Sequence, residues 1–518
     1  MEAQAVVKEN PFANAEACFS RLRDWLGGAE AMGMTHAEVE STVETDGREI
    51  MRWLFQGYLT LRREREVALP QLLGSDNVVR TLHRDSERQL ETVFGTVTAG
   101  RTSYGARGET SLRPLDAELN LPPTRYSDGV ERRVAEQAAQ QSFDEVVLAL
   151  RANTGAVIAK RQVEAVAVRA AQDFDAFYEK REPVPTEDAA DSILVLSFDG
   201  KGVVMRKQDL RPETAAAAEC SSHKLAKRLS KGEKRNKKRM ATVAAIYSIA
   251  PFVRTPEQIV REMQPVHEAL PKRPRPQDKR VSASIAKQPE DVIMEFFAEA
   301  LRRDPERKKH WVVPLDGAET QLELVLACAK AAEVDVTVVL DVIHVIDYLW
   351  DAAFCFHAEG TKEAEAWVNE RLLEILRGNT TTVAAGMRRS ATKRNFSRKQ
   401  RRAVDKCANY LLKYSAYMAY DRYLAAGYPI ATGVIEGACR YLVKDRMDVT
   451  GARWSLAGAE AVLKLRALRK SGDFDAFWSF RQHREYERNH RRLYADFTPP
   501  RVSPSENGSP SRRLQSVQ

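Results

Sequence analysis

Cysteine is scarce in this chain of 518 residues, and its six cysteines include no C-x-x-C pair. Zinc knuckles and disulfide-stapled small domains both depend on closely spaced cysteines. The sequence therefore excludes these two classes, and we expect most of the six to be ordinary buried thiols.

Long apolar runs are also missing, because every apolar segment stops well short of the roughly 20 residues that a bilayer span needs. The first residues, Met1 to Gln4, lack the basic-then-apolar pattern of a signal peptide. Hydrophobic residues make up 43% and charged residues 29%, which is typical of a folded globular protein. We therefore expect a cytoplasmic protein that does not contact the membrane.

The chain has only a small excess of positive charge. Its 80 basic and 72 acidic residues give a net charge of +8 and a pI near 9.0. The cations are clustered, however. One cluster, within residues 224–239, contains Lys227, Arg228, Lys234, Arg235, Lys237, Lys238 and Arg239. A second, within residues 388–402, contains Arg388, Arg389, Arg398 and Lys399. Runs this basic are either solvated loops or phosphate-binding arms. The first lies between two expected strands and next to an Asp-bearing strand, which favours DNA contact.

The length suggests two to four structural units. Helical spacing of apolar residues extends from Pro11 to about Leu90, followed by a β-prone stretch at 92–104 and a Pro-rich passage at 113–123. The expected order is a mainly helical N-terminal region (1–125), a helix-turn-helix-like DNA-binding segment (126–185), an α/β core (186–350), a helical basic insertion (351–430), the last core helix with C-terminal helices (431–497) and a disordered tail (498–518).

The helix-turn-helix prediction is based on two helical runs with a short break. Ser142 is expected to cap the first run, with Glu145 as its capping-box partner, and Thr154-Gly155 ends the pattern. The second run, to about residue 174, opens with Lys160 and Arg161, where a recognition helix would meet DNA. The alternative is an ordinary antiparallel helix pair.

The α/β prediction is based on alternating segments after Pro183-Val184-Pro185. Strands are expected at 192–198, 202–205 and 242–249, then a helix at 291–301, a strand at 310–315, a helix at 321–332 and a strand at 334–340. Strand, helix and strand in succession predict parallel pairing. The fold class is therefore a mixed sheet with helices on both faces.

Three acidic residues stand where phosphodiester chemistry would need them. Asp199 is expected to end an apolar strand before Gly200, and Asp316 repeats this pattern before Gly317. Glu436 lies near the start of a helix that begins about Val434. Each Asp-Gly alone is more often a turn. Together, carboxylates from two strands and one helix can hold two Mg²⁺ ions about 4 Å apart, with Mn²⁺ as a substitute.

Several motifs occur in an order that points to a known family. They are the segments at 115–122 (LDAELNLP), 142–145 (SFDE), 197–202 (SFDGKG), 314–318 (PLDGA), 340–350 (LDVIHVIDYLW) and 451–454 (GARW). On these motifs the chain resembles, over nearly its whole length, the insertion-sequence DDE transposases of the ISKra type, relatives of the Mutator-like elements.

The resemblance implies an RNase H-like core that cleaves DNA at the ends of an insertion sequence and joins it to a target. It implies that Asp199, Asp316 and Glu436 are the catalytic metal ligands, and that the protein works on double-stranded DNA as a homo-oligomer. Asp341 and His344 look like the family's Asp-x-x-His motif beyond the fourth strand.

Some alternatives stay open at this stage. Asp341 could replace Asp316 as the second ligand, and His344 is either a hydrogen-bonded core histidine or, less in keeping with the oxygen preference of magnesium, a ligand. In one alternative Arg453 contacts a DNA phosphate and Trp454 stacks on a base. In the other, Trp454 packs against the sheet and Arg453 is solvated. The alternatives to a transposase are a domesticated DNA-binding protein without catalysis and an RNase H-like nuclease without strand transfer.

Overall fold

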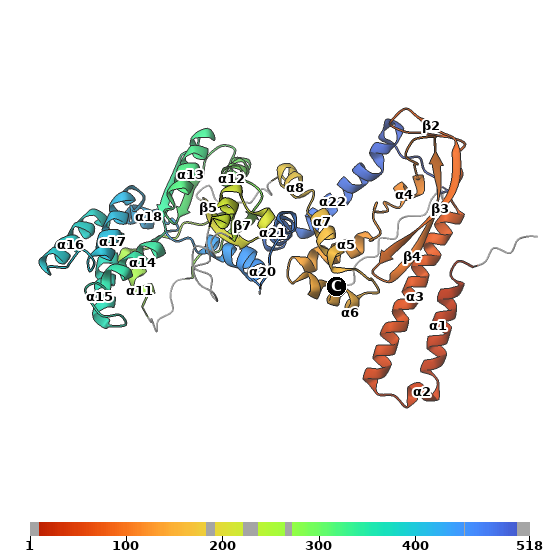
Figure 1. Ribbon diagram of the computed structural model, residues 1–518, viewed down its shortest axis with the longest axis horizontal. Coiled ribbons are helices and arrows are strands. Elements are labelled where there is room, and N and C mark those ends of the chain that lie inside the picture. Colours follow the sequence, from red (N-terminus) through yellow and green to blue (C-terminus); the bar gives the residue numbers. More distant parts are fainter. Residues whose placement is uncertain (1–9, 183–191, 221–236, 265–271, 450, 505–518) are drawn as a thin grey trace, which may run out of the picture. The chain divides into compact units, whose positions relative to one another are not determined.

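The computed structural model describes residues 10–182, 192–220, 237–264, 272–449 and 451–504 (Figure 1). The chain forms two compact units, an N-terminal unit of Met1–Phe177 with Asp475–Gln518, and a sheet unit of Tyr178–Phe474. No helix in the described ranges combines the length and apolarity needed to cross a bilayer.

The N-terminal unit is a helical hairpin, a long β-hairpin and a group of shorter helices. Its elements are α1 (Ala13–Leu26), α2 (Ala29–Met32), α3 (His36–Glu64), β1 (Leu72–Leu73), β2 (Val79–Arg80), β3 (Leu82–Thr92), β4 (Gly95–Gly105), α4 (Pro114–Glu118), α5 (Asp128–Ala138), α6 (Phe143–Asn153), α7 (Lys160–Ala170), α8 (Phe174–Lys180) and α22 (Phe474–Asn489), the last two reaching the unit boundary.

The expectation of helix up to about Leu90 was wrong. Helix α3 ends at Glu64, and β3 pairs with β4 in an antiparallel hairpin from Leu82–Gly105 to Thr92–Gly95. Strand β3 is rich in charged residues that favour helices, whereas its partner β4 is rich in Gly and Thr. Pairing with β4 overrides the local preference of β3.

Helices α5, α6 and α7 pack against one another. The capping box of Ser142 and Glu145 is confirmed, and α6 ends at Asn153 as expected. Helix α7 ends at Ala170, so the stretch from Phe174 is a separate helix, α8. Two helices joined by a short connection are therefore confirmed, while DNA binding by them remains a prediction.

The C-terminal segment belongs with the N-terminal unit rather than with the α/β core as expected. In α22 the buried Trp478 donates its indole N–H to Asp128 at 3.1 Å, and the buried Arg481 pairs with Glu131 of α5. The tail prediction is also wrong for residues 498–504, because Val502 is fully buried and accepts a bond from the Val67 N–H at 2.7 Å. Residues 505–518 lie outside the described residues.

The sheet unit is built on a five-stranded sheet with the order β7-β6-β5-β8-β9. Strands β5 (Ile193–Val204), β6 (Lys238–Ile249) and β7 (Gln277–Ser284) pair antiparallel, whereas β8 (His310–Leu315) and β9 (Val336–Leu340) continue from β5 in parallel. The mixed α/β class and the parallel pairing of β8 with β9 are confirmed.

Helices cover both faces of this sheet, as expected. On one face, Leu194, Leu196 and Phe198 of β5 pack with α12 and α13. On the other face, Ile193 and Val195 share a core with the helices that follow β9, so the helical insertion packs on the sheet. The helices are α9 (Pro212–Glu219), α11 (Pro256–Glu262), α12 (Pro289–Arg303), α13 (Glu319–Ala331), α14 (Val342–Ala353), α15 (Lys362–Leu376), α16 (Thr380–Lys393), α17 (Arg402–Lys413), α18 (Tyr420–Ala425), α19 (Gly433–Ala438), α20 (Asp445–Met447) and α21 (Leu456–Ser471).

Two strand expectations need correction. The predicted break at Asp199-Gly200 is absent, because β5 runs on to Val204 along β6, so Asp199 lies within a strand and not at its end. Strand β7 was missed, because its charged first half (Gln277 to Arg280) masks the buried pattern of its second half.

Candidate functional site

The site lies where β5 and β8 stop pairing. Their parallel ladder ends at the pair Val195–Val312. Two residues further on, the Ser197 hydroxyl donates to the carbonyl of Pro314 at 3.1 Å. Proline has no N–H to donate, which suits a position where the β5 ladder has ended. The carboxyl ends of parallel strands are where α/β sheets usually hold ligands.

Asp199 points to the face of the sheet that carries the later helices, because side chains alternate along a strand and Asp199 has the parity of Ile193 and Val195. Its side chain is partly exposed. One carboxylate oxygen accepts the Gly200 N–H at 2.6 Å, and the other accepts the thiol of Cys439 at 3.0 Å.

Asp316 directly follows β8, as expected, and is partly exposed. Its side chain accepts the Ala318 N–H at 2.9 Å, and its own carbonyl accepts the Tyr410 hydroxyl at 3.1 Å. Gly317 has φ +88°, and a Cβ there would lie 3.1 Å from both Leu340 Cδ1 and Tyr410 Oη. Only glycine fits this turn without strain, which fixes the direction of Asp316.

Glu436 lies in α19, which packs against β5 and β6, and its side chain is exposed. The helix continues as a π-helix from Cys439 to Lys444. Single π-turns of this kind occur often at functional sites. Here the wider turn carries Cys439, whose thiol reaches Asp199.

Asp341 and His344 stand at the start of α14, directly after β9. Asp341 is fully buried and caps the helix by accepting the Ile343 N–H at 2.9 Å. Its other oxygen accepts the Thr432 hydroxyl and lies 3.2 Å from His344 Nδ1. Thr432 comes just before α19, so Asp341 links the helix of His344 to that of Glu436.

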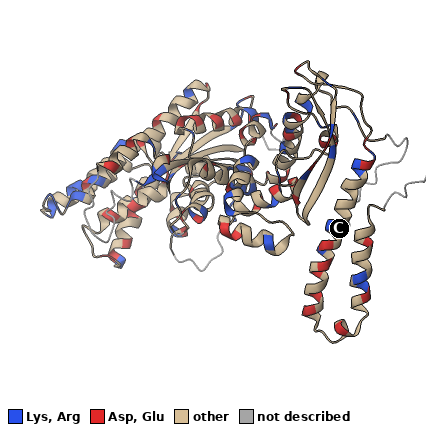
Figure 2. Cartoon of the chain, turned by 45° about the vertical axis from the view of Figure 1, so that its right-hand side comes forward, with Lys and Arg blue, Asp and Glu red and all other residues tan. Residues whose placement is uncertain are grey.

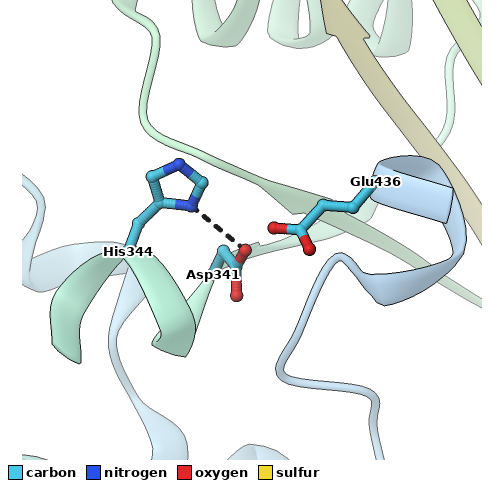
Figure 3. Close-up of side chains that lie close together, drawn as sticks. All are labelled: Asp341, His344 and Glu436. Atoms are coloured by element: carbon cyan, nitrogen blue, oxygen red, sulfur yellow. Dashed lines mark hydrogen bonds and ion pairs between the residues drawn. The ribbon is translucent and has the colours of Figure 1, made fainter. Parts of the chain in front are cut away.

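Asp341, His344 and Glu436 form the group of possible metal ligands in the described part of the chain. Their ligand atoms all lie within 4.8 Å of one another, and the carboxylate of Glu436 faces that of Asp341 (Figure 3). The structure therefore brings Glu436 together with the two accessory residues. Asp199 and Asp316 are not members of this group.

The acidic residues shift the pKa values of two neighbouring side chains, His344 and Cys439. The hydrogen bond with Asp341 raises the pKa of His344 to about 8, against the effect of burial, and the charge of Asp316 adds to the increase. The pKa of the Cys439 thiol is raised mainly by burial, and further by the contact with Asp199 and the charge of Glu436. The thiol therefore stays protonated and donates to Asp199. The charges of Asp341 and Asp316 therefore act on His344, and those of Asp199 and Glu436 act on Cys439.

The basic residues expected to bind DNA are placed in part. Lys227, Arg228, Lys234 and Arg235 lie outside the described residues. Lys238 and Arg239 belong to β6 rather than to a loop, and the Arg239 guanidinium donates to the carbonyl of Ile285 at 2.8 Å. Lys237 lies just before this strand and is exposed.

The second basic cluster gathers at the end of the α16–α17 pair (Figure 2). Arg389, Arg398 and Lys399 are exposed there, whereas Arg388 is half-buried and bonded to Asn409 of α17. In the N-terminal unit Lys160 and Arg161 are exposed at the start of α7, and Lys160 pairs with Asp144 of α6.

Arg453 and Trp454 differ in their exposure to solvent. Trp454 is buried, with 7% of its surface exposed, and its indole N–H donates to the carbonyl of Met447 at 3.1 Å. Arg453 is exposed. This is the packed arrangement that the sequence left open as one alternative.

Reasoning from sequence missed Cys439, Thr432 and Tyr410. For Cys439 and Thr432, the one signal in the sequence was that they lie close to Glu436. For Tyr410 there was no such signal, because Tyr410 and Asp316 lie 94 positions apart in the sequence. No protein-family model matches the chain, and a search of curated proteins finds no match either.

Proposed function

We propose that this chain is a DNA transposase with an RNase H-like core, which cleaves the ends of an insertion sequence and transfers the strands. The observation that carries the proposal is that Asp199 and Asp316 lie beyond the paired parts of the neighbouring strands β5 and β8, while α19, which carries Glu436, packs against β5. The sheet order, with its first three strands antiparallel and the last two parallel, is the order expected of an RNase H-like core.

The donor set fits magnesium. Asp199, Asp316 and Glu436 offer carboxylate oxygens, the ligands that Mg²⁺ prefers, and all three are at least partly exposed, so a phosphate can approach them. Two bound ions would stabilise the charge on the attacking and leaving oxygens of the phosphodiester. Asp199 would hold both ions, and Asp316 and Glu436 one each.

Asp316 is the better second ligand on the same grounds. Asp341 is fully buried, so its carboxylate cannot face a DNA phosphate, whereas Asp316 is partly exposed. Its carboxylate positions His344 and the segment before α19, and the partly exposed Asp316 is the one that would hold Mg²⁺ beside DNA.

The double-stranded DNA that flanks the reading frame is the substrate for the test. Asp199→Asn, Asp316→Asn and Glu436→Gln should each lower the cleavage rate with Mg²⁺ or Mn²⁺ by about 100-fold or more, because each removes a few kcal/mol of transition-state stabilisation. Glu323→Gln, an exposed acid on α13, serves as the control. Full activity of any one of the three variants would remove that residue from the site.

The same assay decides between Asp316 and Asp341, and its products distinguish the other functions. If Asp341→Asn abolishes cleavage and Asp316→Asn does not, Asp341 is the second ligand. Joined products with a target DNA support a transposase, whereas cleavage without joining marks a nuclease. DNA binding without cleavage under either metal marks a domesticated binding protein.

A further inference from the structure

Two members of the Asp341, His344 and Glu436 group have no metal-binding role in the proposed function. His344 Nδ1 lies 3.2 Å from Asp341 Oδ2, and the Glu436 carboxylate completes a set of ligand atoms within 4.8 Å (Figure 3). Two carboxylates and an imidazole nitrogen this close together can hold a metal ion in place of the imidazole proton.

The imidazole decides which cation fits. Magnesium prefers oxygen ligands, whereas a mixed set of nitrogen and carboxylate oxygen suits zinc and its neighbours. Tetrahedral zinc with bonds of about 2.0–2.1 Å keeps its ligand atoms about 3.3 Å apart. The pair of Asp341 and His344 already has this spacing, at 3.2 Å.

The remaining ligand can reach the ion by a small movement. Glu436 is exposed on α19, so its carboxylate can approach by the 1–2 Å or so that zinc ligation requires. Asp341 is held by Ile343 and Thr432 and would stay in place. Three protein ligands leave a fourth position for water, as in zinc sites that remain open.

We propose that Asp341, His344 and Glu436 form a Zn²⁺ site, separate from the magnesium site and sharing Glu436 with it. Zinc bound there holds the Glu436 carboxylate away from magnesium and so inhibits DNA cleavage. Only this last effect rests on the proposed function. Binding through Nδ1 uses the neutral ring, and the displaced proton passes to solvent.

The test is zinc binding by the full-length, chelator-treated protein at pH 8, measured by competition with a chromophoric zinc chelator. We expect one tight equivalent, weakened at least 10-fold in His344→Gln and unchanged in His357→Gln, whose side chain lies just beyond α14 and outside the group. Equal zinc affinity of these two variants would overturn the proposal.

A second variant and an X-ray absorption spectrum distinguish the loss of a zinc ligand from a loss of folding. Glu436→Gln changes an exposed side chain, so it should keep the circular dichroism of the wild type and still weaken zinc binding. X-ray absorption of the zinc-loaded protein should show nitrogen and oxygen neighbours. A sulfur shell would place the metal on cysteines and overturn the assignment.

The two proposals fail in different ways. If no metal supports cleavage, the transposase proposal fails, while the zinc titration of His344→Gln still decides this site. If magnesium supports cleavage and zinc inhibits wild type and His344→Gln equally, only the zinc site is overturned.

Discussion

At the scale of single residues, the central feature is the buried carboxylate of Asp341 and the hydrogen bonds that it accepts. A fully buried carboxylate is costly unless hydrogen bonds satisfy it, and here the Ile343 N–H, the Thr432 hydroxyl and His344 do so. The same contacts connect the end of β9, the start of α14 and the segment before α19. Asp341 therefore sets where both His344 and Glu436 stand.

The contact between His344 and Asp341 predicts a pH-dependent stability. The pKa of His344 is raised from 6.5 to about 8, mainly by the hydrogen bond with Asp341. The stabilisation is complete below pH 6.5, falls as pH rises, and is lost above about 8. Because 38% of the side chain is exposed, we discount the effect for screening to about 1 kcal/mol.

Urea unfolding in the presence of a chelator measures this effect. The difference in unfolding free energy between wild type and His344→Gln should be about 1 kcal/mol smaller at pH 9 than at pH 6. A difference that is the same at both pH values would contradict the role of the charged pair.

At the scale of elements, β7 and α12 are joined by a buried ion pair. Arg280 of β7 pairs with Glu299 of α12, and its guanidinium lies 3.6 Å from the ring centre of Tyr178 and 4.8 Å from that of Phe296. Burial lowers the pKa of Arg280 to about 10. The Glu299 carboxylate thus links the edge strand β7 to α12, and it also pairs with Arg303.

Removing that carboxylate should destabilise the sheet unit. Glu299→Gln leaves buried cations without a counter-charge and should cost about 3 kcal/mol of unfolding free energy. The double variant Arg280→Met, Glu299→Leu should recover most of this loss, since apolar packing can replace a buried pair. Glu323→Gln, at an exposed position of α13, is the control and should change stability by less than about 0.5 kcal/mol. A double variant no more stable than Glu299→Gln would show that the pair itself is required.

At the scale of the whole molecule, the proposed contact with DNA depends on basic residues in each of the two units. Exposed cations stand at the end of the α16–α17 pair in the sheet unit and at the start of α7 in the N-terminal unit. Each phosphate that a cation neutralises releases counterions into solution, so binding should weaken steeply with salt.

Single substitutions test the α16–α17 cluster. Each of Arg389→Ala, Arg398→Ala and Lys399→Ala should reduce the slope of log K against log salt by about 0.9, because each removes one phosphate contact. Lys362→Ala, an exposed cation on α15, should leave the slope unchanged. Binding constants that hardly respond to salt would exclude this cluster from the DNA interface.

Local patterns in the sequence were sufficient to predict the bounds of several elements. The capping box fixed the start of α6, and the bounds of β8 agree with the expected 310–315. The position of Asp316 after that strand also followed from the apolar run before it. Strand β3 could not be predicted in this way, because its charged side chains lose their helical preference only when β4 pairs with them.

The sequence by itself determined the α/β class and the helical insertion, and it supplied the acidic residues of the proposed site, because periodicity and residue type are local properties. Only the tertiary structure decided that β5 continues past Asp199, that Trp454 is buried, and that Glu436 lies with Asp341 and His344. Those outcomes depend on pairing and packing between segments far apart in the chain, and no local pattern encodes the distance between two such segments.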